Sequence, residues 1–363
     1  MNQGTASPRI VRVLVADDNA FMRTAITRMI ESDTELRVAA TAQTGTEALE
    51  KTLALQPDIV TLDVEMPGLN GIETLKRIMQ LSPRPVIMVS SLTQEGAETT
   101  LEALSLGAFD YVPKQQSYIS LDIVKIRGDL VAKIKAAAES HRRKPQLSAV
   151  AKATSAPVVS PPRLAPRVAS SIVAIGTSTG GPKALQEILP MLPADLPVGV
   201  LVVQHMPVGF TGPFARRLDG LCKISVREAT PDATIEPGVV YIGPAGLHMT
   251  VQRRSNSKVA IRLSNSPLNT LHTPSVDVMM SSVAEVFRSL SMGIILTGMG
   301  ADGLQGMRAI VREGGLTVGQ DEASCTVYGM PRSCAEAGLI QRVVSLVQVP
   351  EQILLATRYS KSA

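Results

Sequence analysis

The chain has 363 residues, which at about 100–200 residues per domain predicts two folded units. Hydrophobic residues make up 45% and charged residues 19% of the chain, a globular composition that excludes extensive disorder. The net charge of +4 is local, because residues 141–169 hold six basic residues and no acidic one. A basic face spread over a folded domain is therefore not indicated, and nucleic acid is not an expected partner.

No stretch approaches the roughly 18 uninterrupted apolar residues of a membrane span, so we expect no insertion into a membrane. The polar N-terminus predicts no secretory signal. Cys222, Cys325 and Cys334 lie far apart, which excludes a disulfide framework or a zinc ribbon. These features are typical of a protein in a reducing cytoplasm.

Before residue 141, short apolar runs alternate with amphipathic segments. The predicted strands are 10–16, 58–64, 85–90 and 110–112, and the predicted helices are 20–31, 72–81 and 95–106. The strands are nearly continuous in Val, Ile and Leu, as strands covered on both faces should be. This alternation predicts an α/β fold with a doubly wound parallel sheet.

Five polar residues stand where these strands end: Asp17, Asp18, Asp63, Ser90 and Lys114. Ligands of an open parallel sheet bind at the carboxyl ends of its strands, so we expect these residues to share one edge. Three carboxylates repel one another unless a cation lies among them, and oxygen ligands with room for water suit Mg²⁺. A single Asp is more often a helix cap, and both Asp18 and Asn19 are candidates to cap the following helix.

Residues 9–130 resemble a two-component receiver domain. The matching stretches are Ala16-Asp17-Asp18-Asn19, Leu62-Asp63-Val64-Glu65-Met66-Pro67-Gly68, Met88-Val89-Ser90-Ser91 and Tyr111-Val112-Pro113-Lys114. The resemblance implies a flavodoxin-like fold with Asp63 as phosphoacceptor, and Mg²⁺ held by Asp17, Asp18 and Asp63. It also implies Ser90 as the switch hydroxyl, Lys114 as the phosphate partner and Tyr111 as the aromatic residue that changes rotamer. Receivers usually have Pro directly after this Lys, whereas Gln115 follows here, a departure that bears on the local loop geometry.

Residues 141–169 combine basic residues with five prolines and no aromatic residue, so they cannot bury a core and tend to stay extended. We interpret them as an interdomain linker, since a structureless loop this long is uncommon inside a compact fold. After it, strands are predicted at 171–175, 198–203, 292–296 and 316–318, with a helix at 182–189.

A glycine-rich turn follows the first of these strands: Ile175-Gly176-Thr177-Ser178-Thr179-Gly180-Gly181-Pro182. Its G-x-S-x-G spacing lets a sharp strand-to-helix turn expose the hydroxyl of Ser178. A phosphate-binding loop would need Lys after its last Gly, where Pro182 stands, and a dinucleotide fingerprint would need Gly at position 178. The turn therefore favours a serine nucleophile.

A serine nucleophile needs a base and a group that orients the base. Of the four histidines, only His205 ends a predicted strand; His141, His248 and His272 lie in the linker, a loop and a polar stretch. Asp302 lies in a glycine-rich loop whose N–H groups can stabilise an oxyanion. Each residue also has a structural alternative: His205 can be a strand-end histidine whose hydrogen bonds are satisfied structurally, and Asp302 can be an ordinary turn residue. The order Ser–His–Asp along the chain also differs from the order Ser–Asp–His of α/β-hydrolases.

Residues 170–350 closely resemble the catalytic domain of the chemotaxis protein-glutamate methylesterases, the CheB family. The matching stretches are Ala174-Ile175-Gly176-Thr177-Ser178-Thr179-Gly180-Gly181, Gln204-His205-Met206-Pro207 with Gly209-Phe210-Thr211, Pro274-Ser275-Val276-Asp277, and Leu296-Thr297-Gly298-Met299-Gly300-Ala301-Asp302-Gly303. The resemblance implies a Rossmann-like domain with the triad Ser178, His205 and Asp302. It implies that Met299 supplies an oxyanion N–H and Thr179 active-site hydrogen bonds.

We leave Pro274-Ser275-Val276-Asp277 out of the predicted site, because Ser275 is a good N-cap and Asp277 suits the first turn of a helix. The predicted domains are a receiver at 9–130, a linker at 141–169 and a methylesterase at 170–355. A receptor adaptor without catalysis and a transcription regulator are the alternatives; the second would need a basic recognition helix, and the basic residues lie in the linker.

The resemblance implies a phosphorylation-activated hydrolase that removes methyl esters from chemoreceptor glutamates in chemotactic adaptation, with deamidation of receptor glutamines as a second reaction. The expected partners are methyl-accepting chemoreceptors and a histidine kinase as phosphodonor. Mg²⁺ is expected in the receiver and no cofactor for ester hydrolysis. We further hypothesise that the unphosphorylated receiver blocks access to Ser178 and that phosphate on Asp63 relieves the block.

Overall fold

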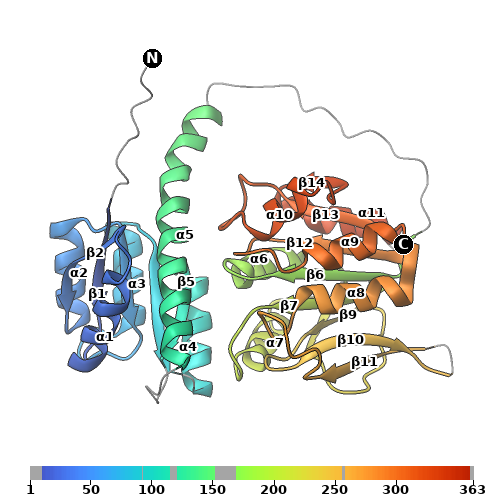
Figure 1. Cartoon of the computed structure of the whole chain (residues 1–363), viewed down its shortest axis with the longest axis horizontal. Helices are drawn as coiled ribbons and strands as arrows, with labels where there is room; N and C mark the ends of the chain where they lie inside the picture. Colours follow the sequence, from blue (N-terminus) through green and yellow to red (C-terminus); the bar gives the residue numbers. More distant parts are fainter. Residues whose placement is uncertain (1–9, 92, 115–120, 152–168, 256–257, 360–363) are drawn as a thin grey trace. The chain divides into compact units, whose positions relative to one another are not determined.

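The computed structural model describes residues 10–91, 93–114, 121–151, 169–255 and 258–359, and the chain divides into two compact units near residue 154. Each unit contains its own parallel sheet with helices (Figure 1), which confirms the predicted fold class of two doubly wound α/β domains. None of the described helices is long and apolar enough to cross a membrane.

The first unit holds five strands, in which every neighbouring pair is parallel, in the order β2-β1-β3-β4-β5. The strands are β1 (Val11–Ala16), β2 (Leu36–Ala42), β3 (Ile59–Asp63), β4 (Val86–Ser91) and β5 (Asp110–Lys114). The helices are α1 (Ala20–Glu31), α2 (Gly45–Leu55), α3 (Gly71–Leu81), α4 (Gln94–Ser105) and α5 (Leu121–Ala151). The chain order reverses between β1 and β3, and open parallel sheets bind ligands at such a switch point.

The sequence prediction lacks β2, α2 and α5 of this unit. Only Leu36 and Ala42 of β2 are buried, so the strand has no continuous apolar run to reveal it. Helix α1 begins after Asn19, whose side chain accepts the N–H groups of Phe21 and Met22. The structure thus selects Asn19 over Asp18 as the cap of α1.

Helix α5 extends into the segment predicted as a linker. Because α5 ends at Ala151, residues 141–151 are helical and not extended. Alanine, lysine, arginine and glutamate, all strong helix formers, dominate the sequence from 132 to 144 and account for this extension. Residues 152–168 and Gln115 lie outside the described residues, and the domain boundaries stay a prediction.

The second unit holds a seven-stranded sheet of parallel pairs, in the order β14-β13-β12-β6-β7-β9-β8, and a separate antiparallel hairpin, β10-β11. The strands are β6 (Ile172–Thr177), β7 (Gly199–Gln204), β8 (Ser225–Glu228), β9 (Val239–Ile242), β10 (His248–Arg253), β11 (Val259–Ser264), β12 (Ser291–Ile295), β13 (Leu316–Gln320) and β14 (Arg342–Val344). The helices are α6 (Gly181–Ile188), α7 (Thr211–Asp219), α8 (Val276–Phe287), α9 (Leu304–Arg312), α10 (Met330–Glu336) and α11 (Val349–Ala356).

Strand β6 lies at the switch point of the second sheet, with β12 on one side and β7 on the other. The carboxyl ends of these three neighbours lead directly into the loops that carry Ser178, His205 and Asp302. Parallel pairing therefore brings together three residues that are far apart in the sequence.

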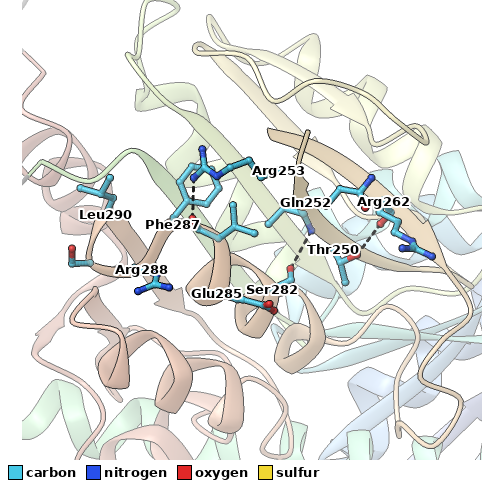
Figure 2. Close-up of a pocket in the computed structure, with 12 residues that line it drawn as sticks. Thr250, Gln252, Arg253, Arg262, Ser282, Glu285, Phe287, Arg288 and Leu290 are labelled. Atoms are coloured by element: carbon cyan, nitrogen blue, oxygen red, sulfur yellow. Dashed lines mark hydrogen bonds between the residues drawn. The ribbon is translucent and has the colours of Figure 1, made fainter. Parts of the chain in front are cut away.

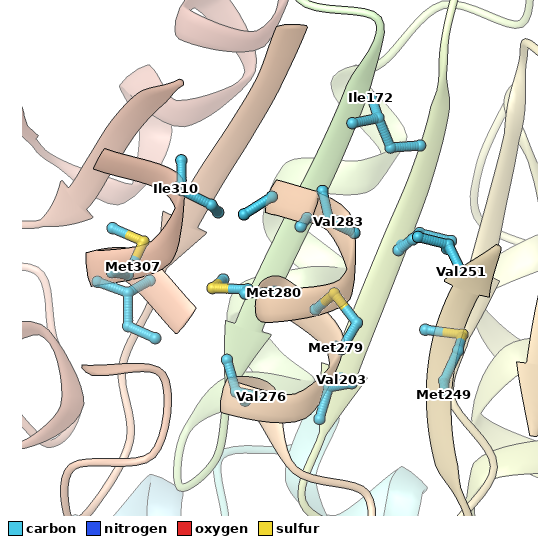
Figure 3. Close-up of a cluster of buried hydrophobic side chains, with 14 of the residues drawn as sticks. Ile172, Val203, Met249, Val251, Val276, Met279, Met280, Val283, Met307 and Ile310 are labelled. Atoms are coloured by element: carbon cyan, nitrogen blue, oxygen red, sulfur yellow. The ribbon is translucent and has the colours of Figure 1, made fainter. Parts of the chain in front are cut away.

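Helix α8 lies in the core of this unit and packs against α9, β6 and β10. Met280 and Val283 of α8 join Met307 and Ile310 of α9 in one fully buried apolar cluster (Figure 3). Burying each such side chain contributes about 1.5–3 kcal/mol, so the core fixes where α8 begins. Its first turn contacts the candidate active site.

Candidate functional site

Ser178 lies in the tight turn between β6 and α6. Its N–H donates to the carbonyl of Thr297 in the loop after β12 at 3.1 Å, and its own carbonyl accepts from Gly181 N at 2.8 Å. The side-chain amide of Gln204, the last residue of β7, also donates to this carbonyl at 3.0 Å. Contacts with the loop after β12 and with the Gln204 side chain of β7 therefore fix the backbone of the serine, and no described hydrogen bond uses its hydroxyl.

Glycine is required at three positions around Ser178, each for a different physical reason. Gly176 has no room for a side chain, because a Cβ there would collide with the side chain of Val276 in α8. Gly180 has a φ of +79° and ends the turn in the left-handed region, which favours glycine. A Cβ on Gly298 would lie 2.9 Å from Cβ of Ser178, so this glycine permits the loop after β12 to approach the serine.

His205 follows β7 and pairs with Asp302. Nε2 of the imidazole lies 2.8 Å from Oδ2 of Asp302, and both side chains are about nine-tenths buried. Nδ1 of His205 has no hydrogen-bond partner among the described residues, and no described hydrogen bond joins it to Ser178. With Nε2–H donating to the carboxylate, Nδ1 is the nitrogen available to accept a proton.

Asp302 accepts hydrogen bonds from four further donors, all close to the first turns of α8 and α9. The donors are the Ser275 hydroxyl at 2.9 Å and the N–H groups of Val276 at 2.8 Å, Asp277 at 3.0 Å and Gly303 at 3.1 Å. Burial raises the pKa of Asp302, but the hydrogen bond with His205, together with the N–H groups of Asp277 and Val276, outweighs it and holds the pKa well below its usual range. The carboxylate is therefore ionised and oriented.

The segment Pro274-Ser275-Val276-Asp277 is the part of this site that the sequence interpretation leaves out. Ser275 is the N-cap of α8, as predicted, since its hydroxyl oxygen accepts from Val278 N. The same hydroxyl donates to Asp302, so one residue starts the helix and orients the carboxylate. Its match to the family motif is the signal that identifies it in the sequence.

His272 is a second residue that the predicted site lacks. Its ring stacks on the ring of His205, with centroids 4.0 Å apart and planes 21° apart. Together with the bond to Asp302, this stacking restricts the orientation of the His205 imidazole. A polar stretch before a helix gives no sequence signal for such a contact.

The loop after β12 presents the predicted oxyanion donor. The hydroxyl of Thr297 donates to the carbonyl of Thr179 at 2.9 Å and accepts from Val327 N at 3.0 Å, which holds the loop to the serine turn. Met299 is half-buried, and its N–H donates to no acceptor among the described residues. Thr179 is buried and contributes its carbonyl to this network.

A second cluster lies at the switch point of the first sheet. Oxygen atoms of Asp17, Asp18 and Asp63 lie within 4.8 Å of one another. Nζ of Lys114 lies 2.6 Å from Asp63 Oδ2 and 3.0 Å from Asp17 Oδ2. Burial raises the pKa of Asp63 to about 6, against the opposing effect of Lys114. This all-oxygen donor set fits Mg²⁺.

The remaining predicted residues flank this cluster. Ser90 ends the buried part of β4, and its hydroxyl donates to the carbonyl of Gly96 in α4 at 3.2 Å. Tyr111 of β5 is 4% exposed, so its ring points into the first unit. Nζ of Lys133 lies 5.4 Å from the centre of that ring and donates to the Tyr111 carbonyl.

Comparison with known proteins identifies both units. The CheB methylesterase family model matches residues 173–353, and the response regulator receiver domain model matches residues 13–122. A protein-glutamate methylesterase/protein-glutamine glutaminase 2 of Nitratidesulfovibrio vulgaris is 46% identical over 95% of this chain and 99% of its own length. The chain belongs to the protein-glutamate methylesterase family.

Further relatives match either nearly the whole chain or about half of it. A protein-glutamate methylesterase/protein-glutamine glutaminase of Pyrococcus horikoshii is 44% identical over 96% of this chain and 94% of its own length. The crystal structure of the Thermotoga maritima CheB methylesterase catalytic domain covers 52% of this chain and 99% of that chain, with 39% identity and a TM-score of 0.50. The family therefore combines the two units of this chain.

Proposed function

We propose that this protein is a phosphorylation-activated serine hydrolase that removes methyl esters from glutamyl residues of chemoreceptors and so gives adaptation in chemotaxis. The observation that carries the proposal is the buried His205–Asp302 pair, 2.8 Å between Nε2 and Oδ2, at the switch point that also holds Ser178. Family membership, at 46% identity over nearly the whole chain, supports the substrate class.

In this reaction Ser178 Oγ attacks the ester carbonyl while Nδ1 of His205 takes the hydroxyl proton. Asp302 keeps the other imidazole proton on Nε2 and stabilises the imidazolium that forms. The N–H of Met299, which has no acceptor among the described residues, would donate to the oxyanion. The imidazolium protonates the departing methoxide, methanol leaves, and water hydrolyses the acyl-enzyme by the reverse proton transfers.

The bond between Ser178 and His205 must form in the complex with substrate. Catalytic hydrogen bonds are often long or misaligned in structures without substrate and tighten when substrate binds. The triad assignment therefore does not require a hydrogen bond between Ser178 and His205 in the structure without substrate. Glutamine deamidation would use the same residues, with ammonia leaving in place of methanol and glutamate as the shared product. The printed names of relatives support this second reaction.

For the first unit, we infer that Asp63 accepts a phosphoryl group from a histidine kinase. Asp17, Asp18 and Asp63 would hold Mg²⁺, which when bound neutralises negative charge on phosphoryl oxygens. Lys114, whose Nζ already lies 2.6 Å from Asp63 Oδ2, would form an ion pair with the added phosphate. The Ser90 hydroxyl would turn from Gly96 towards it, and Tyr111 would respond at the neighbouring strand.

Receptor membranes carrying radiolabelled methyl esters test this proposal. The full chain should release methanol, release should increase when a small phosphodonor and Mg²⁺ are added, and Asp63→Asn should remove the increase. Ser178→Ala should abolish release in both conditions, whereas a non-catalytic adaptor would keep its function. Equal release with and without the phosphodonor would contradict activation by phosphorylation. We propose a cytoplasmic location, where the kinase and the receptor substrates would meet the enzyme.

A further inference from the structure

Two leucines in the loop that precedes α8 are the most exposed large hydrophobic residues of the described chain. Leu271 is 91% and Leu268 is 87% exposed, and Val208 follows at 68%. Burying a side chain of this kind is worth about 1.5–3 kcal/mol, so three of them close to one site mark a surface for binding.

Leu271 and Val208 lie next to the candidate active site, and Leu268 lies in the same loop as Leu271. Leu271 directly precedes His272, whose ring stacks on His205 at 4.0 Å. Val208 follows His205 by three residues, and its Cγ2 lies 3.0 Å from where a Cβ on Gly246 would be. The N–H of Gly246 in turn donates to the carbonyl of residue 273, two residues after Leu271, at 3.1 Å.

The segment that carries the leucines is fixed to the buried His248. Nε2 of His248 lies 3.1 Å from the carbonyl of Pro267 and 3.2 Å from the hydroxyl of Thr270, on either side of Leu268. Nδ1 of the same ring accepts the N–H of Ser275, the residue that orients Asp302. The leucines are therefore presented by a loop that shares its anchors with the triad.

The chemistry of this loop points to a neutral, partly apolar partner. Residues 265–274 contain no lysine, arginine, aspartate or glutamate. An ester attacked by Ser178 must lie against His205, so the chain that bears it must lie across the residues flanking His205. On a helix, side chains three and four positions from the ester share its face and lie about 5–6 Å away, so they approach the surface around His205 together with the ester.

We propose that Val208, Leu268 and Leu271, here called the apolar rim, dock apolar side chains on the ester-bearing face of the receptor helix. This inference rests on the proposed function. The apolar rim recognises an amphipathic helix by the side chains one turn from the ester, as helix-in-groove recognition does. The uncharged loop favours the neutral ester over the carboxylate product, which promotes product release.

The test uses the full chain with Leu268→Asn and Leu271→Asn combined, activated by acetyl phosphate and Mg²⁺. With receptor membranes as substrate, the KM should rise about tenfold or more, because two partly buried leucines are lost from the complex. Hydrolysis of a small activated ester, p-nitrophenyl acetate, should stay unchanged because it does not reach the apolar rim. Leu221→Asn, an exposed leucine after α7, is the matched control and should change neither substrate.

Three results would overturn the docking role. One is an unchanged receptor KM in the double variant, and another is a parallel loss on both esters, which would place the effect in the triad. The third is faster hydrolysis of the small ester by the unphosphorylated double variant, together with an unchanged receptor KM. This result would mean that the first unit of the same chain, and not the receptor helix, occupies the apolar rim. A parent chain inactive on both esters would instead overturn the proposed function.

Discussion

Replacing Asp302 by Asn tests the acid–base pair directly. Both carboxylate oxygens are surrounded by donors: Oδ2 accepts from His205 and Val276, and Oδ1 accepts from Ser275, Asp277 and Gly303. The NH₂ group of an asparagine must replace one oxygen, so it faces at least one backbone N–H in either orientation. The variant therefore cannot restore the full set of hydrogen bonds.

The size of the effect follows from these contacts. Hydrogen bonds to a charged group contribute about 1.5–3 kcal/mol each, so losing two should lower the free energy of unfolding by about 3 kcal/mol or more. The melting temperature of this unit should fall by about 10 °C. Loss of the carboxylate also releases the imidazole from its Nε2–H tautomer, and kcat should fall about a thousandfold to ten-thousandfold.

The assay measures methanol release and thermal unfolding by circular dichroism on the same samples. Asp277→Asn is the matched control, since its carboxylate accepts from Gly306 N and does not contact His205. It should keep kcat within about threefold of the parent. A folded Asp302→Asn variant with kcat within tenfold of the parent would refute the assignment of Asp302, and so would an equal loss in Asp277→Asn.

Four further outcomes are expected. Ser275→Ala should lower kcat about tenfold and Ser275→Thr should restore it, because the hydroxyl to Asp302 returns; equal kcat values in both variants would contradict this. Gly298→Ala should lower kcat at least a hundredfold in protein that circular dichroism shows to be folded, since its Cβ would meet Met330 Sδ and lie 2.9 Å from Ser178 Cβ; unaltered turnover would show that the loop can move away. Lys114→Met should weaken phosphorylation of Asp63, measured with labelled phosphodonor, whereas Lys133→Met should not. Mg²⁺ affinity, measured by calorimetry, should fall about tenfold per pH unit below about pH 6, because protons compete for Asp63; a flat profile between pH 5 and 7 would refute the raised pKa.

The strand-end residues could be predicted from the sequence because a parallel sheet gathers the ends of its strands. Ser178 and His205 follow buried apolar runs, and the rule for open sheets is enough to expect them at one edge. Asp63 and Asp17 follow the same logic in the first unit. These predictions need only the order and direction of the strands.

Other features depend on contacts that no local pattern encodes. The role of Ser275 combines an N-cap, which the sequence predicts, with a bond to Asp302, which only the packing of α8 creates. The stacking of His272 on His205 joins two loops about 70 residues apart. The half-buried edge strand β2 and the whole of helix α5 depended on competing local preferences, and the prediction missed both.

The position of α8 bears on how the enzyme can be controlled. Its first turn orients Asp302, and its other turns are enclosed by the sheet, the hairpin and α9, so this end of the helix cannot shift without disturbing the whole interior. The His205–Asp302 pair is accordingly in place before the first unit is phosphorylated. We therefore propose that a phosphoryl group on the other unit has no acid–base pair left to assemble and acts instead on which molecules reach the site.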